Sequence, residues 1–373
     1  MLRAGGVPIE QITGLTAIVL LPWIFKFLWA PAVDALRAPW WGFRAWIICA
    51  QALMGLTLVP LLWLDPLARF DAWRILLILH AIAAATQDVA IDALAINAVP
   101  HDQRGLLNGA MQAGMLGGRS LFGGGALVAA AWFGWHAIVL LLVVWIWLTL
   151  AVVILVRMPS PPLSVRVRGE FRRALAAALR QRATWLGVAF ALTSAAAFEA
   201  TGQLAGPFLV DRGVSASVIG LFFGVIAVAA MLAGGLIGGA VSDRLGRRRS
   251  VAIFLAGFVA AILLLAAYDA AAVGARPAVL LTLLAAMYLC VGLFTAASYA
   301  LFMDLTDPRL GGTQFSAFMA ATNGCESWST LAGGRVAAAS GYPTAFVSLC
   351  VASLASLWLL RGLGPRLSKK SIG

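Results

Sequence analysis

The sequence predicts an all-α polytopic membrane protein built from two helix bundles. Hydrophobic residues make up 62% of the 373 residues, and charged residues make up only 11%. Soluble globular domains average about 25% charged residues, so the charge content excludes an ordinary soluble domain. The apolar residues form long segments, and the basic residues gather in the short loops between them and at the C-terminus. The net charge of +12 therefore indicates membrane topology and not nucleic-acid binding.

Eleven apolar segments are long enough to cross a bilayer as helices. They cover residues 10–31, 43–63, 73–99, 105–131, 135–156, 185–210, 218–241, 251–268, 277–302, 313–338 and 343–360.

A polar segment separates the fifth span from the sixth. Its second half places Phe171, Leu175 and Leu179 on one side of a helix among arginines. This pattern predicts an amphipathic helix at the membrane surface, and a solvated connector is the alternative. The predicted organisation is an N-terminal bundle over 1–157, a cytoplasmic linker over 158–183, and a C-terminal bundle with a basic tail over 184–373.

The basic residues also predict the orientation. Arginines follow the first, fifth, seventh and last spans, which are all odd-numbered. Because basic loops stay in the cytoplasm, the linker and the C-terminus are expected there. An odd number of spans then places Met1 outside.

Three polar side chains interrupt the third span: Gln87, Asp88 and Asp92. The two aspartates are four residues apart, so they share one helix face. Since an aspartate at a helix centre costs about 2.5–3.5 kcal/mol on insertion scales, two on one face indicate a wet, charge-handling transport path. An interhelical contact that only holds the bundle together is the alternative.

Lys26 lies at a depth similar to that of Asp92, about 12 Å from the end of its helix at Asp34. A pair with Asp88 or Asp92 is therefore geometrically possible. The alternative is that its long stem lets the ammonium group reach the headgroups.

Two glutamates, Glu199 and Glu326, lie near the middle of the sixth and tenth spans. Apolar surroundings favour the neutral form of a carboxyl group, so Glu199 is a candidate proton site. Gln203 and Asn323 share faces with these glutamates and could bind a polar solute, or could only link helices.

The loop after the seventh span has the pattern G-x-x-x-D-R-x-G-R-R from Gly239. Glycine there allows close helix approach, Asp243 can cap a helix, and arginines can anchor to lipid headgroups and helix C-termini. A weaker copy over 31–44 contains Asp34 and Arg44. Two such loops in two halves indicate an internal duplication.

This loop resembles the signature loop of the major facilitator superfamily, and further segments resemble the AmpG-type muropeptide permeases, which are grouped with the acetyl-coenzyme A transporters. The segments are 25–31 with Asp34, 85–88 with 92–93, 104–105, 208–214 and 313–315. The resemblance implies a major facilitator fold and a proton-coupled importer of anhydro-muropeptides in the bacterial inner membrane.

Roles for individual residues follow from the resemblance together with the polar positions. Proton coupling is assigned to Glu199, Asp88 and Asp92. Substrate binding is assigned to Gln87, Arg119, Gln203, Asn323 and Glu326. Charge pairing and gating are assigned to Lys26, Asp34, Asp243, Arg244, Arg247 and Arg248.

The sequence departs from the family in three respects. The family's arginine in the fourth span lies about one turn before Arg119. Ala95 and Asn97 stand where a basic residue and an acid are usual, and Glu326 stands where an arginine is frequent. A siderophore importer or a drug exporter on the same fold therefore stays open. The family also begins with a helix that would precede Met1, so a start-site error or a truncated, non-transporting membrane protein is a further alternative.

Nothing in the sequence predicts an enzyme, a metal site or a cofactor. The four cysteines lack metal-ligand spacing, and the glycine runs lack the context of a phosphate loop. The expected partners are a small-molecule solute, protons and membrane lipids, with no nucleic acid, and the chain is expected to be a monomer.

Overall fold

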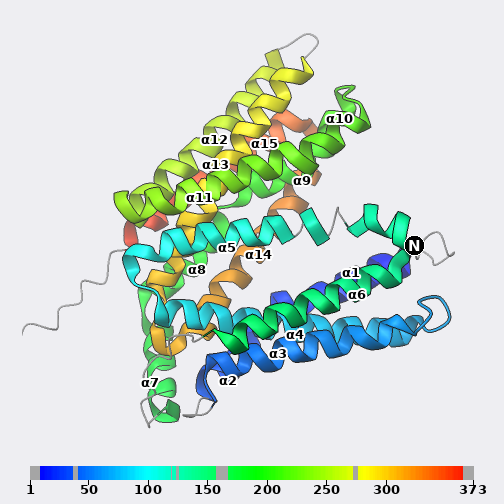
Figure 1. The fold of residues 1–373 in the computed structure, drawn as a ribbon. Coiled ribbons are helices and arrows are strands. Elements are labelled where there is room, and N and C mark those ends of the chain that lie inside the picture. The colour runs from blue at the N-terminus through cyan, green and yellow to red at the C-terminus, as the bar shows by residue number, and fades with distance from the viewer. Residues whose placement is uncertain are drawn as a thin grey trace, which may run out of the picture. The chain divides into compact units, whose positions relative to one another are not determined.

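The computed structural model describes residues 9–36, 41–118, 120–122, 126–156, 167–271 and 276–363, and these are almost entirely helical (Figure 1). The α-helices are α1 Ile9–Phe25, α2 Ala30–Ala35, α3 Phe43–Leu58, α4 Phe70–Ala98, α5 Arg104–Gly118, α6 Ala126–Leu155, α7 Val167–Arg180, α8 Arg182–Thr193, α9 Ala196–Asp211, α10 Ala216–Leu221, α11 Ala227–Leu245, α12 Arg247–Ala271, α13 Pro277–Leu305, α14 Gly311–Ser340 and α15 Tyr342–Gly362. Short 3₁₀ turns η1 Lys26–Leu28, η2 Val59–Leu62, η3 His101–Gln103 and η6 Pro308–Leu310 join some of them, and the π-helical segment η5 Phe222–Ile226 joins α10 to α11.

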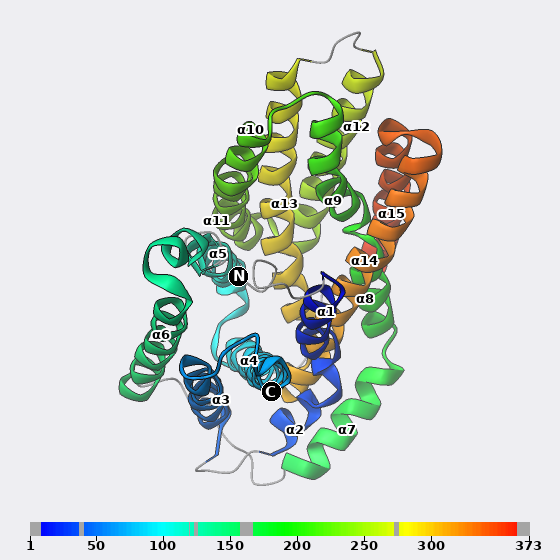
Figure 2. The same cartoon turned by 90° about the vertical axis from the view of Figure 1, so that its right-hand side faces the viewer.

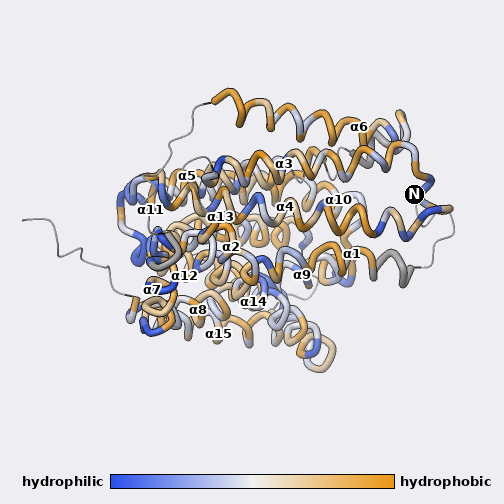
Figure 3. The backbone as a smooth tube through the Cα atoms, turned by 90° about the horizontal axis from the view of Figure 1, so that it is seen from below, coloured by the Kyte–Doolittle hydropathy of each residue, from blue (hydrophilic) through white to orange (hydrophobic). Residues whose placement is uncertain are grey.

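Eight helical segments of the described chain are long and apolar enough to cross a membrane. They correspond to eight of the eleven predicted spans. The predicted first span is broken at η1, α5 ends at Gly118, and α14 carries many polar residues. The number eleven therefore stays a prediction. Figure 3 shows α6 as hydrophobic along most of its length, and many of its leucine and valine side chains are exposed, as expected for a lipid-facing helix.

The chain divides into two compact units, each made of separate stretches of sequence. The first contains residues 1–98, 121–178 and 306–320, and the second contains 99–120, 179–305 and 321–373. The N-terminal part of α14 thus packs with helices of the first half, and α5 packs with helices of the second half. The predicted bundle boundaries at 157 and 184 stay a prediction.

In the first unit, α3 packs against both α4 and α6. Small residues of α4 allow this close packing: Ala90 and Ala93 are fully buried beside Val33 of α2 and Ile47 of α3. A second apolar cluster lies at the other end of α3, where Leu61 and its neighbours contact α6.

The predicted linker helix is present as α7, and two of its three expected apolar residues, Phe171 and Leu175, lie on its packed side. Ala174 and Ala178 are buried against Leu310 of η6, and Phe171 packs beside them. Leu179 is 52% exposed. The helix therefore packs on protein through its alanines together with Phe171 and Leu175. Residues 158–166 of the predicted linker lie outside the described ranges.

In the second unit, α13 packs against α11 and α12, and α15 packs against α12 (Figure 2). Glycines of α11 allow the first of these contacts, because a Cβ atom at Gly238 would lie 2.5 Å from Leu293 Cα. Phenylalanines fill the interior: Phe258 lies edge-on to Phe198 and Phe294, with ring centroids 5.4 and 5.2 Å away.

Candidate functional site

A buried charge cluster lies in the first unit, where η1 faces α4. The helix α1 ends at Phe25, and the following 3₁₀ turn starts with Lys26, whose side chain is 4% exposed. Its ammonium group is hydrogen-bonded to Asp88 Oδ2 and lies 3.8 Å from Asp92 Oδ2. Both aspartates project from the same face of α4, one turn apart. Lys26 therefore bridges the two carboxylates, as the helical spacing allowed.

The two aspartates differ in accessibility. The Asp88 side chain is 34% exposed, whereas that of Asp92 is 4% exposed. Lys26 is the one cation that the described structure pairs with either of them. When all three groups are ionised, the cluster keeps one negative charge, and one added proton makes it neutral. An uncompensated charge in apolar surroundings is costly, so this arrangement suits a site that gains and loses a proton.

Aromatic residues around the cluster hold η1 against α4. Trp29 Nε1 donates a hydrogen bond to Thr86 Oγ1 at 3.1 Å. Lys26 Nζ lies 5.9 Å from the centroid of the Trp23 ring, which adds a cation–π contact. Sequence reasoning missed the Trp29–Thr86 contact, although both residues lie in the segments that resemble the permease family.

Gln87 lies next to this cluster on α4, and its side chain is only partly exposed. Its Oε1 atom is buried and accepts no hydrogen bond from the described part of the chain. A buried acceptor without a donor is unfavourable, so Gln87 is suited to accept a hydrogen bond from a bound group. Arg119, the other predicted binding residue of this half, lies outside the described ranges.

The predicted polar residues of the second half meet in the second unit. Gln203 Nε2 of α9 donates to Glu326 Oε1 of α14 at 3.4 Å, and both side chains are exposed. Asn323 lies one turn before Glu326 and is partly exposed. Tyr288 of α13, which sequence reasoning missed, is close enough to Glu199 for an electrostatic interaction.

The surroundings of Glu199 differ from those of a residue inside one long helix. The predicted sixth span is divided at Ser194–Ala195 into α8 and α9, and Glu199 lies in the first turn of α9. Its side chain is partly buried there, near the positive end of the α9 dipole.

Asp34 and Asp243, the predicted gating aspartates, both cap helices. Asp34 is fully buried and accepts hydrogen bonds from Gly312 N at 3.0 Å and Thr313 N at 2.7 Å, at the start of α14. Asp243 accepts hydrogen bonds at the start of α5, from the backbone N–H groups of Gly105 and Leu106, both at 2.8 Å. These contacts satisfy N–H groups that a helix leaves unpaired and place a negative charge at its positive end.

The arginines of the loop after α11 have separate roles. Gly246 has a φ of +84°, which ends α11 and lets the chain turn. Arg247 forms an ion pair with Asp243 at 2.5 Å, and Arg248 donates to the carbonyls of Leu360 and Arg361 at the end of α15. Arg244 is exposed, and the described structure gives its side chain no ion pair or hydrogen bond.

A second group of charges, missed by sequence reasoning, surrounds Asp304 at the end of α13. Its carboxylate forms ion pairs with Arg104, at 2.9 Å between Nη1 and Oδ1, and with Arg247, at 3.1 Å between Nε and Oδ2. His101 Nδ1 lies 2.9 Å from Oδ1. The internal duplication could have pointed to Asp304. It lies 207 residues after Asn97, and the equivalent capped residues Gly105 and Gly312 are also 207 residues apart.

The helices α5 and α11 touch through glycines. A Cβ atom at Gly109 would lie 2.6 Å from the carbonyl oxygen of Gly235, and Gly105 and Gly239 leave equally little space for each other. The expectation that Gly239 permits close helix approach is therefore confirmed.

Comparison with known proteins places the chain in a family. The sequence profile of the Major Facilitator Superfamily matches residues 7–234 and, in a second match, residues 191–373. The chain belongs to the Major Facilitator Superfamily. The same profile matches the chain twice, in two overlapping stretches. This agrees with the two similar loops whose aspartates, Asp34 and Asp243, each cap a helix.

Relatives of this superfamily transporter include the anhydromuropeptide permease of Escherichia coli K12. That protein is 26% identical over 366 residues, which cover 93% of this chain and 71% of the permease. The fold is similar to that of a variant of the E. coli fucose:proton symporter FucP, with a TM-score of 0.75 at 15% identity over 95% of this chain and 93% of FucP. The proton:xylose symporter XylE gives a TM-score of 0.74 at 12% identity over 95% of this chain and 86% of XylE. This major facilitator protein is thus a multi-pass membrane transporter of a small-molecule solute, and not an enzyme.

Proposed function

We propose that the protein is a proton-coupled importer of a bulky polar solute, a muropeptide-like cell-wall fragment, across the bacterial inner membrane. The relative in E. coli is named for anhydromuropeptides, and two proteins of the same fold are named as proton symporters. These names support the proposal, and the charge cluster of the first unit carries it.

The coupling step uses the cluster of Lys26, Asp88 and Asp92. A proton that reaches the more exposed Asp88 neutralises the cluster, while Lys26 stays paired with the buried Asp92. Moving the cluster into less polar surroundings costs less free energy when the cluster is neutral than when it is charged. Binding of the proton therefore allows the helices to change from one transport conformation to the other. Loss of the proton on the other side resets the charge. Proton movement is in this way tied to the transport cycle.

Each half of the chain offers uncharged and charged groups to the solute. Gln87 offers a buried acceptor beside Asp88, and Arg119 is proposed as a further binding residue. Gln203, Asn323 and Glu326 offer donors and acceptors on α9 and α14. Sugar hydroxyls and peptide amides need this mixture of donors and acceptors. Glu199 is proposed as a further proton site.

The proposed orientation places the linker over 158–183 and the C-terminus in the cytoplasm. The capping aspartates Asp34 and Asp243 and the arginines Arg244, Arg247 and Arg248 then lie at the cytoplasmic face, where anionic lipids attract the basic groups. Asp34 and Asp243 act there as gating residues, because each caps a helix start that must be captured again every time this face closes.

A transport assay tests this function directly. The protein is reconstituted into vesicles containing a pH-sensitive dye, and an anhydromuropeptide is added outside. Solute-dependent acidification of the lumen is expected for wild type and is expected to be absent for Asp88→Asn. Asp71→Asn, which changes an exposed acid at the start of α4, is the matched control and should acidify normally. Proton uptake with a siderophore but not with the muropeptide would contradict the substrate, and no proton uptake with either would contradict the coupling.

A further inference from the structure

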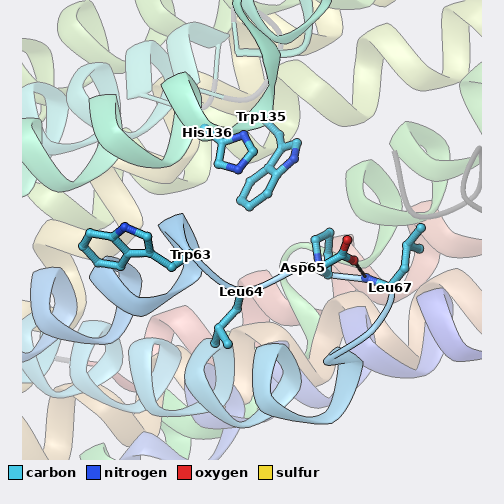
Figure 4. Close-up of a pocket in the computed structure, with 7 residues that line it drawn as sticks. Trp63, Leu64, Asp65, Leu67, Trp135 and His136 are labelled. Carbon is cyan, nitrogen blue, oxygen red and sulfur yellow. Dashed lines mark hydrogen bonds between the residues drawn. The ribbon is translucent and has the colours of Figure 1, made fainter.

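A pocket of about 300 Å³ lies in the first unit, away from the charge cluster. The loop between η2 and α4 forms one side, with Trp63, Leu64, Asp65 and Leu67, and α6 forms the other side, with Trp135 and His136 (Figure 4). Its volume is at the lower limit of small-molecule sites, so it suits a single small group. None of its residues takes part in the proposed coupling step.

The aromatic side of the pocket is held in place by a break in α6. Gly134 has φ +76° and ψ 169°, a conformation outside the helical region that glycine adopts without strain. The following Trp135 lies edge-on to Trp73, with ring centroids 5.3 Å apart, and carries His136 stacked against it at 3.6 Å. Trp73 in turn donates from Nε1 to the carbonyl of Leu64 at 2.9 Å. The loop and the start of α6 are therefore fixed to α4.

The opposite side of the pocket carries a negative charge. Asp65 Oδ1 accepts hydrogen bonds from the backbone N–H groups of Leu67, at 2.7 Å, and Ala68, at 3.1 Å. These two donors lower the pKa of the Asp65 carboxyl below its ordinary value, so it stays ionised at neutral pH. Both bonds use Oδ1, and within the described chain Asp65 forms no ion pair. Its second oxygen is therefore available to a ligand.

Aromatic faces complete the lining. Trp63 also belongs to the lining, and its side chain is 78% exposed. Tryptophan faces attract cations, and aromatic rings around an ammonium group are a recurrent way of binding it. An interfacial tryptophan belt would explain the exposure of Trp63, but it does not explain an ionised carboxylate in the same pocket lining as two tryptophans.

The position along the helices points to the source of the cation. The candidate membrane span Phe43–Leu62 ends directly before Trp63, and the span Trp132–Leu155 begins three residues before Trp135. The pocket therefore lies at the level of the membrane surface, where lipid headgroups are at high local concentration.

We propose that this pocket binds an ammonium group, that of an ethanolamine phospholipid headgroup. Asp65 pairs with the ammonium group, and Trp63 and Trp135 of the same lining provide aromatic surface beside it. The acyl chains of the lipid lie along the exposed apolar surface of α6. The site is separate from solute transport and does not depend on the proposed substrate.

Native mass spectrometry of the full chain in detergent tests the proposal. The protein is titrated with phosphatidylethanolamine and with phosphatidylglycerol of the same acyl chains. Asp65→Asn keeps an oxygen for the turn but removes the charge, and Trp63→Ala removes one ring. Each variant should bind phosphatidylethanolamine about fivefold to tenfold more weakly than wild type, with phosphatidylglycerol binding unchanged. Trp132→Ala, an 81% exposed tryptophan outside the pocket lining, is the control and should bind as wild type does.

Three results would overturn the proposal. Equal binding of the two lipids would remove the ammonium selectivity, and wild-type affinity in both pocket variants would remove the site. Displacement of the lipid by free ethanolamine at similar concentration would assign the pocket to a soluble amine instead of a lipid. Gel filtration of each variant shows whether it is folded. If Trp63→Ala does not fold, the milder Asp65→Asn still tests the proposal.

Discussion

Asp34 and Asp243 make the same contact at two places in the chain: each carboxylate caps the first backbone N–H groups of a helix from the other half of the sequence. Asp34 caps α14, and Asp243 caps α5. The capped residues Gly105 and Gly312 are 207 residues apart. The equivalence indicates that an ancestral unit was duplicated together with its capping contact, and that both copies still use it.

A second pair of contacts repeats in the same way. Arg44 donates to the last carbonyls of α6, and Arg248 donates to the last carbonyls of α15. The copies differ at the ends of α4 and α13. Asn97 donates one hydrogen bond to the carbonyl of Pro308, whereas Asp304 forms ion pairs with Arg104 and Arg247. One copy of this contact is thus neutral and the other is charged.

Asp34→Asn and Asp243→Asn are both expected to slow transport without abolishing solute binding. The amide can still accept one hydrogen bond, but it loses the charge at the helix N-terminus, which is worth about 0.5–2 kcal/mol. Initial transport rates should fall roughly twofold to thirtyfold, as this energy implies, while the equilibrium affinity for solute changes little. Asp71→Asn is the control. Wild-type rates in both variants would mean that the two caps are not part of the gate.

Gly109→Ala should destabilise the protein, because its methyl group would meet the backbone of Gly235 on α11. Overpacking of this kind typically costs about 1–3 kcal/mol, which should be visible as a lower melting temperature in detergent. Gly114→Ala on the same helix is the matched control, since a Cβ atom there meets nothing within 4 Å. Equal melting temperatures of the two variants would exclude the glycine contact as a source of stability.

A reporter fused after Gly373 should read as cytoplasmic, and a reporter inserted in the linker near residue 170 should agree with it. The prediction rests on the arginines that follow odd-numbered spans. A reporter in the loop at residues 65–69 should read as external and is the internal control. A periplasmic reading after Gly373 would reverse the orientation and move the capping aspartates to the other face.

The sequence was sufficient for the fold and for part of the site. The hydrophobic segments and the G-x-x-x-D-R-x-G-R-R loop predicted the fold, because the length and hydrophobicity of a helix are properties of the local sequence. The pairing of Lys26 with Asp88 and Asp92 could be foreseen from depth alone, since few cations lie within the apolar segments. The duplication also predicted a role for Asp34 from its likeness to Asp243.

Other features depend on packing that the sequence does not display. The break between α8 and α9 lies at Ser194–Ala195, with no proline or glycine to mark it. The α7 helix buries small alanines against Leu310 where the larger Leu179 was expected. The Arg104–Asp304 pair joins residues 200 positions apart. Each of these features is decided by neighbours distant in sequence.

Asp88→Asn should abolish proton-coupled transport while the protein still reaches the membrane. The substitution keeps the shape of the side chain and removes the accessible carboxylate, so the cluster of Lys26 and Asp92 is neutral without a proton. Accumulation in vesicles and the amount of folded protein are measured together. The control is Asp102→Asn, an exposed acid in η3. Normal accumulation in Asp88→Asn would show that this face is structural.

Glu199→Gln should separate solute exchange from solute accumulation. In the first turn of α9, the helix dipole favours the charged carboxylate, while apolar surroundings favour the protonated form. A conformational change that alters either influence changes the proton affinity, and this difference couples the proton to the solute. Glutamine mimics the protonated form in both conformations, so the variant should bind and exchange solute but should lose accumulation driven by a pH gradient. Counterflow and uptake in the same vesicles measure the two activities, with Asp71→Asn, which changes an exposed acid outside the proposed site, as the control. If the Glu199→Gln variant still concentrates solute, the proton site lies elsewhere, and Asp88 becomes the residue that carries the coupling alone.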